Sequence, residues 1–329
     1  MSTVLVTGGA GFIGSHLCRA LLREGREVIA YDNLDDFYDV RIKRANLASL
    51  QEHARFRFIE GDIRDRAALD ALFRAHAIES VVHLAARAGV RPSIEQPVLY
   101  ADVNVTGTAT LLEAMHDADV RHMLFASSSS VYGNQEKVPF SEDDPVDHPI
   151  SPYAATKKAG ELLCHSYVHT CGMNIWCLRF FTVYGPGQRP EMAIARFLRA
   201  AHVDEVVTVY GDGSMMRDFT YVDDIVRGVV AALPRVQGYE IANIGGAHAH
   251  ALHEVLDIVE QVSGRTLERR HVPVPEGDVR MTSADTSRAA RLFGFHPSVP
   301  LAEGIRRQWQ SMQQQTVVVE AATTTSFSS

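Results

Sequence analysis

The amino-acid sequence predicts an α/β fold, a doubly wound parallel sheet followed by a smaller C-terminal α/β domain. Short apolar runs alternate with amphipathic stretches over the first 180 residues, a glycine-rich turn follows the first run, and the pattern changes after residue 180. Such alternation implies parallel strands joined by right-handed crossovers, with helices on both faces of the sheet. The 329 residues are enough for one large core and a smaller companion.

The apolar runs are typical of buried strands. They lie at residues 4–6, 28–30, 56–59, 81–84, 123–126 and 175–179. The amphipathic stretches predict helices at residues 13–23, 67–75, 99–115 and 154–169. Ligands of such sheets bind at the carboxyl ends of the strands, so we expect the functional residues there.

Glycine and proline become frequent after residue 180, which predicts a second domain. We assign residues 1–180 to the first domain, with a later segment near 215–245 returning to it, because residues 239–244 again have the pattern of a strand. Residues 181–315 form mainly the second domain. The Ser/Thr-rich end predicts a disordered tail at 316–329.

Charge and composition argue against several classes of partner. The 40 acidic and 32 basic residues leave a net charge of −8 without an evident basic patch, so we expect no nucleic-acid partner. No stretch approaches 18 uninterrupted apolar residues and no basic leader precedes the first strand, so we expect a cytoplasmic protein without a membrane segment. The four cysteines have no metal-ligand spacing, and we expect no metal.

The turn after the first strand has the pattern of a dinucleotide-binding loop. Residues 7–14 are Thr-Gly-Gly-Ala-Gly-Phe-Ile-Gly, and glycines there let a pyrophosphate approach the N-terminus of the following helix. Asp32 ends the second strand, where a carboxylate binds adenosine ribose hydroxyls and repels a 2′-phosphate, so the sequence predicts NAD. The alternative for Asp32 is a solvated loop residue. Asp62, after the third strand, either meets the adenine or caps a helix.

Tyr153 and Lys157 lie four residues apart in a predicted helix and therefore share one face. Ten tyrosines and four lysines among 329 residues give such a pair by chance with a probability of about 0.12. Support comes from the serine run 127–130, which ends the fifth strand. Lys157 and a positive nicotinamide favour the tyrosinate, so we expect Tyr153 to act as general base and Ser128 to orient the reacting hydroxyl. Without that pair, the serines would suit a polar strand end.

Motifs along residues 4–309 resemble the extended short-chain dehydrogenase/reductases that act on nucleotide sugars. They include VTGGAGFIGSHL, YDN, GDIRD, HLAA, NVTGT, SSSSVYG, SPYAATKKAGE, RFFTVYGPGQRP and GDGSMMRDFTYVDDIV. Within this family, DNLDDFYDVRIKRANL, HLAARAGVRPSIE and VYGPGQRPEMA are most similar to the UDP-glucuronate 4-epimerases. The resemblance implies a Rossmann domain that binds NAD and a second domain that binds a UDP-sugar. It also implies 4-epimerisation, first of all of UDP-glucuronate to UDP-galacturonate, by oxidation at C4, turnover of the keto sugar and return of the hydride.

The resemblance also implies roles for individual residues. Its catalytic residues are Tyr153, Lys157 and Ser128, which stands four residues before the Tyr of VYG. The NAD-binding residues implied are Gly8, Gly11, Phe12, Ile13, Gly14, Asp32, Asn33, Asp62, Ile63, Leu84, Ala85, Ala86, Asn104, Tyr153 and Lys157. The substrate-binding residues implied are Arg91, Ser128, Ser129, Ser130, Thr182, Arg189, Arg217 and Arg280.

The two positions after Ser128 bear on the substrate. Decarboxylating and dehydrating relatives carry a Glu or an Asp-Glu pair there, whereas this chain has Ser129 and Ser130. A uronate oxidised at C4 is a β-keto acid that readily loses carbon dioxide, so its carboxylate must be held in an unreactive orientation. Ser129, Ser130 and Thr182 are expected to donate hydrogen bonds to it. Arg217 resembles the arginine that clamps the nucleotide diphosphate.

Three alternatives stay open at this point. They are a UDP-glucose or UDP-N-acetylhexosamine 4-epimerase, a nucleotide-sugar decarboxylase or dehydratase, and a non-catalytic NAD sensor. The helices predicted at 99–115 and 154–169 resemble the pair that builds a four-helix dimer interface in this family, so we expect a homodimer. Their amphipathicity suits burial within one subunit equally well.

Overall fold

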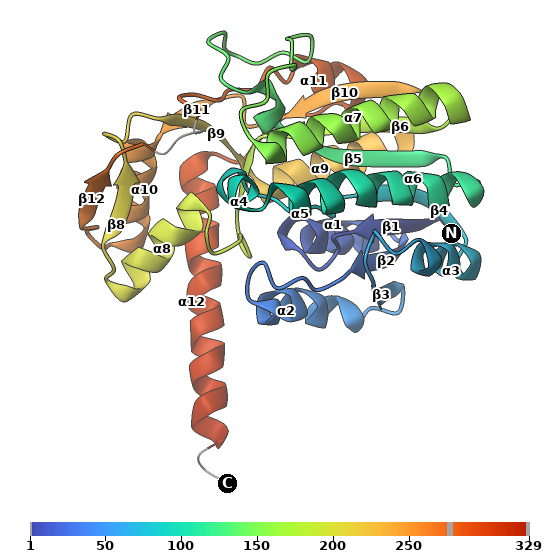
Figure 1. The fold of residues 1–329 in the computed structure, drawn as a ribbon. Coiled ribbons are helices and arrows are strands. Elements are labelled where there is room, and N and C mark those ends of the chain that lie inside the picture. The colour runs from blue at the N-terminus through green and yellow to red at the C-terminus, as the bar shows by residue number, and fades with distance from the viewer. Residues whose placement is uncertain (1, 275–278, 327–329) are drawn as a thin grey trace.

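A seven-stranded parallel sheet forms the centre of the computed structural model, which describes residues 2–274 and 279–326 (Figure 1). The strand order is β10-β6-β5-β4-β1-β2-β3, and every neighbouring pair is parallel. The strands are β1 (Thr3–Thr7), β2 (Glu27–Asp32), β3 (Phe56–Glu60), β4 (Ile78–His83), β5 (His122–Ser128), β6 (Asn174–Phe180) and β10 (Tyr239–Ile244). The predicted doubly wound sheet is confirmed.

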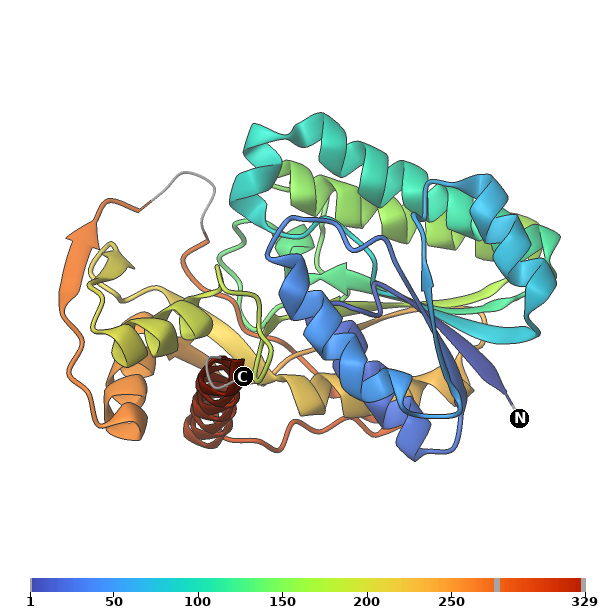
Figure 2. The ribbon, with the colours of Figure 1, turned by 90° about the horizontal axis from the view of Figure 1, so that it is seen from below.

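Helices cover both faces of this sheet, as the view in Figure 2 shows. One face carries α3 (Arg66–Ala75), α4 (Val90–Glu95), α5 (Pro97–Ala101), α6 (Gly107–Asp117) and α7 (Pro152–Cys171). The other carries α1 (Phe12–Arg23), α2 (Val40–Gln51), α9 (Val222–Ala232) and α11 (Ser287–Phe293). Val4 and Val6 pack into the core on the α1 face and Leu5 into the core on the other, all fully buried. Burial on both faces explains why the strand sequence is continuously apolar.

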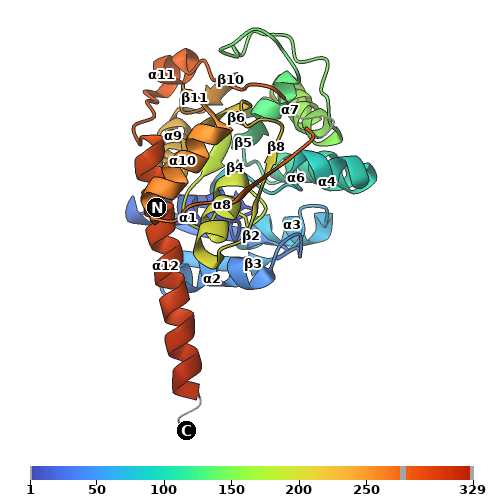
Figure 3. The same cartoon turned by 90° about the vertical axis from the view of Figure 1, so that its left-hand side faces the viewer.

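The smaller domain lies beside the sheet, on the side that Figure 3 brings forward. It holds a three-stranded sheet of β7 (Thr182–Tyr184), β9 (Met216–Tyr221) and β11 (Ala249–Ala251), and a pair formed by β8 (Val207–Tyr210) and β12 (Arg269–Val272). Its helices are α8 (Ala193–Val203), α10 (Leu252–Ser263) and α12 (Leu301–Ser326), and α10 packs against the other two.

The segment near 215–245 is divided between the two parts of the molecule. Strand β9 belongs to the smaller sheet, whereas α9 packs against α1 and β10 pairs with β6 in the large sheet. The exact boundary between the domains stays a prediction.

Two stretches differ from the sequence-based expectation. The helix predicted at 99–115 is interrupted by a π-helical turn, Asp102–Thr106, between α5 and α6. Such turns are common near functional sites, and here the turn carries Asn104 inward. The tail expected at 316–329 continues α12 as far as Ser326, since residues 305–326 contain neither Gly nor Pro to end the helix. Residues 327–329 lie outside the described residues. No helix in the described ranges is long and apolar enough to cross a membrane.

Candidate active site

A cavity of about 530 Å³ opens at the carboxyl ends of the parallel strands. The chain runs outward in opposite directions from β1 and β4, and this change of direction leaves a crevice between the connections that follow the two strands. The cavity is lined by the turn after β1, the ends of the neighbouring strands and the start of α7. The site therefore lies where the fold predicts it.

The glycine turn forms one wall of this cavity and leaves no room for side chains. Gly8 has φ of 71°, and a Cβ added there would lie 2.8 Å from the backbone nitrogen of Ala85. A Cβ on Gly14 would lie 2.1 Å from the carbonyl oxygen of Gly8. Helix α1 begins next to this wall, and its N-cap Gly11 offers no side chain to the first N–H groups. A close backbone wall beside an uncapped helix N-terminus fits a pyrophosphate.

Asp32 is buried at the end of β2 and lines the cavity, so it is not a solvated loop residue. Its Oδ2 accepts a hydrogen bond from the Ala10 nitrogen at 3.2 Å, and its Oδ1 accepts one from the Leu34 nitrogen at 2.9 Å. The Lys43 ammonium lies 3.3 Å from Oδ1. This arrangement holds the carboxylate at the edge of the cavity next to the glycine turn.

Asp62 also lines the cavity, and it caps no helix because the N-cap of α3 is Asp65. Its carboxylate accepts hydrogen bonds from Arg64 and, at 3.0 Å, from the side-chain nitrogen of Asn33. The hydrogen bonds from Arg64 lower the pKa of Asp62 to about 2. An ionised acceptor therefore stands at this end of the cavity.

Tyr153, Lys157 and Ser128 meet at the opposite end of the cavity. Ser151 caps α7 by accepting a hydrogen bond from the Ala154 nitrogen at 3.1 Å, so Tyr153 falls in the first turn of the helix. Lys157 is buried one turn later, and its ammonium donates to the Ala126 carbonyl at 2.8 Å. The predicted trio is therefore brought together by the end of β5 and the start of α7.

The protonation of this trio is dominated by burial. Burial raises the pKa of Tyr153, and a hydrogen bond with Ser128 lowers it. Burial lowers the pKa of Lys157 to about 8. The raised pKa of Tyr153 is opposite to the direction expected from Lys157 alone, because removal of the phenol from water outweighs nearby charge. Lys157, in turn, gives up its proton more readily than an exposed lysine.

Hydroxyl groups and arginines line the cavity around the trio. Ser129, Ser130 and Thr182 contribute from the turn after β5 and from β7. The Ser130 hydroxyl is buried and has no hydrogen-bond partner in the described part of the chain. A buried hydroxyl without a partner is costly, so it fits a site that receives a polar ligand. Arg189 and Arg217 also line the cavity.

Three residues predicted for the site lie outside the cavity lining that the structure describes. Asn104 is buried behind the wall, where its side chain binds the backbone nitrogen and carbonyl of Arg87 at 2.8 and 3.0 Å. Arg91 donates to the Tyr210 hydroxyl at 2.9 Å and stacks on its ring at 4.2 Å. Arg280 is exposed, and its carbonyl accepts from the Met216 nitrogen at 3.0 Å. Asn104 therefore orients the chain at Arg87 in this structure.

Two cationic residues of the cavity were not predicted. Arg87 follows β4, and its Nη1 lies 2.9 Å from both carboxylate oxygens of Asp35. Its Nε is buried without a hydrogen-bond partner in the described chain, which again fits a polar ligand. The sequence could have indicated Arg87 as a site residue, because it follows the end of a strand and ligands bind at the carboxyl ends of the strands. Lys43 lies near the start of α2, and no local motif marks it.

A buried ion pair lies next to Ser127 and so close to the part of the cavity that Ser128 lines. Arg179 and Glu161 are 1% and 0% exposed and form two hydrogen bonds, of 2.8 and 2.9 Å. Ser127, next to Ser128 in β5, donates to the same carboxylate at 2.6 Å. Three elements, β5, β6 and α7, are thus joined at the level of the reactive groups.

The fold and the cavity define a Rossmann-type dinucleotide-binding protein with a serine, a tyrosine and a lysine together in the cavity lining. Residues 4–245 match the model of the NAD dependent epimerase/dehydratase family, and the chain belongs to this family.

Relatives of known name are similar over almost the whole chain. UDP-glucuronate 4-epimerase from Thermodesulfobacterium geofontis is 44% identical over 308 residues, which cover 93% of this chain and 95% of that one. The crystal structure of UDP-glucuronic acid 4-epimerase from Bacillus cereus with UDP-glucuronic acid and NAD has a TM-score of 0.89 at 38% identity, covering 95% and 99% of the two chains. UDP-glucose 4-epimerase from Thermotoga maritima, solved with UDP-glucose, has a TM-score of 0.88 at 32% identity, covering 95% and 99%.

Proposed function

We propose that this enzyme converts UDP-glucuronate to UDP-galacturonate, with NAD as a cofactor that is regenerated in each turnover. The observation that carries the proposal is the set of hydroxyl-bearing residues that line the cavity with the trio, Ser129, Ser130 and Thr182, among which the buried Ser130 hydroxyl has no hydrogen-bond partner in the described chain. The similarity to UDP-glucuronate 4-epimerases supports the same substrate.

When bound, NAD would supply reversible hydride transfer at C4 of the sugar. Tyr153 removes the proton from the C4 hydroxyl and gives it back, because its phenol lines the cavity and lies within hydrogen-bonding reach of Ser128. Ser128 orients the same hydroxyl. Lys157, anchored on the Ala126 carbonyl, keeps a positive charge near the phenol and favours its ionised form.

The cofactor is held by the glycine turn, by Asp32 and by the ends of the central strands. The residues proposed for this task are Gly8, Gly11, Phe12, Ile13, Gly14, Asp32, Asn33, Asp62, Ile63, Leu84, Ala85 and Ala86, all of which line the cavity. Arg217, which lines it from the smaller domain, is proposed to bind the diphosphate of the substrate.

The carboxylate of the keto intermediate is held by Ser129, Ser130 and Thr182, with Arg189 close to the same part of the cavity. Neutral hydroxyls donate hydrogen bonds without supplying a proton for acid catalysis. No carboxyl side chain stands at positions 129 and 130 to assist decarboxylation or dehydration. The site therefore favours return of the hydride over loss of carbon dioxide.

The test is a direct assay of the purified enzyme with UDP-glucuronate, UDP-glucose and UDP-N-acetylglucosamine, without added NAD. We expect UDP-galacturonate as the product, identified by NMR, and no release of carbon dioxide. Thr182→Val is expected to lower kcat/KM for the uronate more than for a neutral sugar. Equal losses on both kinds of sugar would contradict the role of Thr182, and absence of any uronate conversion would refute the function.

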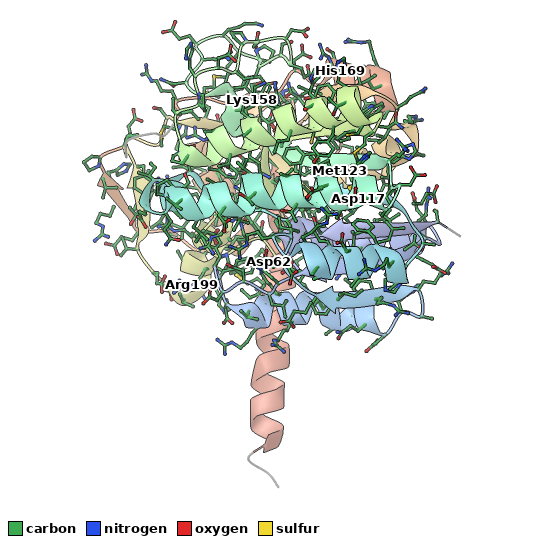
Figure 4. All side chains as sticks on the ribbon, turned by 45° about the vertical axis from the view of Figure 1, so that its right-hand side comes forward. Asp62, Asp117, Met123, Lys158, His169 and Arg199 are labelled. Atoms are coloured by element: carbon green, nitrogen blue, oxygen red, sulfur yellow. The ribbon has the colours of Figure 1, made fainter. Side chains whose placement is uncertain are left out.

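We also propose a homodimer formed through α6 and α7, shown from the outside in Figure 4 with Lys158 and His169 on α7 and Asp117 at the end of α6. The supporting observation is apolar exposure on α7 and the adjacent α5, where Leu162 is 57% and Val98 81% exposed. Leu162→Arg should give a monomer in size-exclusion chromatography with light scattering, whereas Val203→Arg on α8 should not. A dimer that survives Leu162→Arg unchanged would exclude this interface.

A cytoplasmic location is proposed on the state of the cysteines. Cys18, Cys164, Cys171 and Cys177 are all free thiols in the structure, and three of them are buried. Free thiols of this kind suit a reducing compartment.

A further inference from the structure

Lys43 is buried beside Asp32 although nothing in the proposed reaction uses it. It stands on the inward side of α2 in register with Leu47 and Leu50, where an apolar residue would be expected. Its side chain is 9% exposed, and its ammonium lies 3.3 Å from the Asp32 carboxylate, which is itself 5% exposed. Asp32 is the only ion-pair partner of Lys43 among the residues that the structure describes.

Three donors converge on the Asp32 carboxylate. They are the Lys43 ammonium at 3.3 Å, the Ala10 nitrogen at 3.2 Å and the Leu34 nitrogen at 2.9 Å. A carboxylate offers about four lone-pair sites, so roughly one acceptor position is left for a ligand hydroxyl. Asp32 and Lys43 both line the cavity next to the glycine turn. The carboxylate thus occupies what would otherwise be an anion-binding site made of one ammonium and two backbone N–H groups.

In dinucleotide-binding folds, the residue at the end of this strand decides between a ribose hydroxyl and a 2′-phosphate. We infer that Asp32 fills a latent phosphate site in which Lys43 is the principal donor, and that the pair together sets the preference for NAD over NADP. While Asp32 is present, a 2′-phosphate meets a fixed negative charge and finds the ammonium already engaged. Once Asp32 is replaced by a small neutral residue, Lys43, Ala10 and Leu34 are released for the 2′-phosphate. The inference rests on the NAD binding in the proposed function.

The test compares Asp32→Ser, Lys43→Met and the double variant by cofactor binding, measured without any turnover. Each protein is stripped of its cofactor and titrated calorimetrically with NAD and with NADP. We expect the wild type to bind NAD preferentially and Asp32→Ser to gain NADP affinity by roughly 10- to 100-fold, the range for one charge-assisted hydrogen bond. The double variant should lose that gain and bind NAD no worse than Asp32→Ser.

Lys43→Met alone separates this role from a merely structural one. It leaves Asp32 in place, so NADP should still be rejected, while NAD binding weakens only modestly because the carboxylate keeps its two backbone donors. If Asp32→Ser proves too unstable to titrate, 2′,5′-ADP serves as the probe in thermal unfolding. It should raise the melting temperature of Asp32→Ser more than that of the double variant.

The inference is overturned if Asp32→Ser gains no affinity for NADP or 2′,5′-ADP, or if the gain persists in the double variant. If either result is found while the wild type binds NAD and epimerises its substrate normally, the proposed function still stands. Loss of NAD binding by the wild type would instead refute the proposed function.

Discussion

Removal of Glu161 is expected to be among the most destabilising single changes in this part of the molecule. Glu161→Ala deletes the two hydrogen bonds to Arg179, of 2.8 and 2.9 Å, and the 2.6 Å bond from Ser127. Arg179 is 1% exposed and would be left as a buried charge without its partner. Breaking a buried ion pair in this way costs about 3–5 kcal/mol, and counting two charge-assisted hydrogen bonds gives a similar ~3–6 kcal/mol.

The cost translates into a measurable change in melting temperature. At ~2.1 cal/mol/K per residue, the 329 residues give an unfolding entropy of about 0.7 kcal/mol/K. A loss of about 4 kcal/mol therefore lowers Tm by roughly 6 °C, which circular dichroism or calorimetry on the cofactor-free protein resolves.

A matched surface pair and a paired replacement control this experiment. Glu205→Gln removes the exposed ion pair with Arg199, where both side chains are at least half exposed, and should leave Tm unchanged. Replacing both members of the buried pair, as Glu161→Leu with Arg179→Met, should recover much of the loss, because no charge is then left unpaired. A Tm shift for Glu161→Ala no larger than that for Glu205→Gln would refute the reasoning.

The remaining predictions concern the active site. Tyr153→Phe should lower kcat by roughly 10²–10⁴-fold, measured as UDP-galacturonate formation per NAD-loaded subunit; normal turnover would remove Tyr153 as the base. Burial lowers the pKa of Lys157 to about 8, so Lys157 loses the positive charge that favours the Tyr153 phenolate as the pH rises through this value. We therefore expect kcat/KM to fall with rising pH near 8, and a profile that rises there would contradict the role of Lys157. Gly14→Ala places a Cβ 2.1 Å from the Gly8 carbonyl, so the purified variant should release little NAD on acid treatment. An NAD content equal to that of the wild type would show that the turn tolerates the methyl group.

The large sheet could be predicted because its strands are buried on both faces. Val4, Leu5 and Val6 are completely buried and therefore form a continuous apolar run, which needs no knowledge of distant contacts. The same holds for Tyr153 and Lys157, since a spacing of four on one helix fixes their common side. Both inferences depend on local geometry alone, and the structure confirms the fold and places the two residues in one cavity.

Other features depend on contacts between distant parts of the chain. Lys43 could not be identified as a site residue from the sequence, because it reaches Asp32 only through the packing of α2 next to the end of β2. Asn104, whose binding to the cofactor stays a prediction, lies in a π-helical turn and hydrogen bonds through its side chain to the backbone of Arg87. Periodicity does not reveal such a turn, because the helix continues on both sides of it. The sequence shows that residue 87 is an arginine, but it does not show that the Nε of this arginine is buried.

The end of β5 has a consequence for how this enzyme can change over time. Ser127 and Ser128 are chemically identical neighbours that both border the cavity, yet the Ser127 hydroxyl donates to the buried Glu161, whereas the Ser128 hydroxyl accepts from the Ser130 nitrogen in the turn after β5, since successive strand residues point to opposite faces. Inserting or deleting one residue in β5 would exchange their orientations and disable both tasks at once. Substitutions after the strand, at Ser129 and Ser130, can therefore change the substrate range. Insertions and deletions within β5 cannot, because they would disrupt the roles of Ser127 and Ser128.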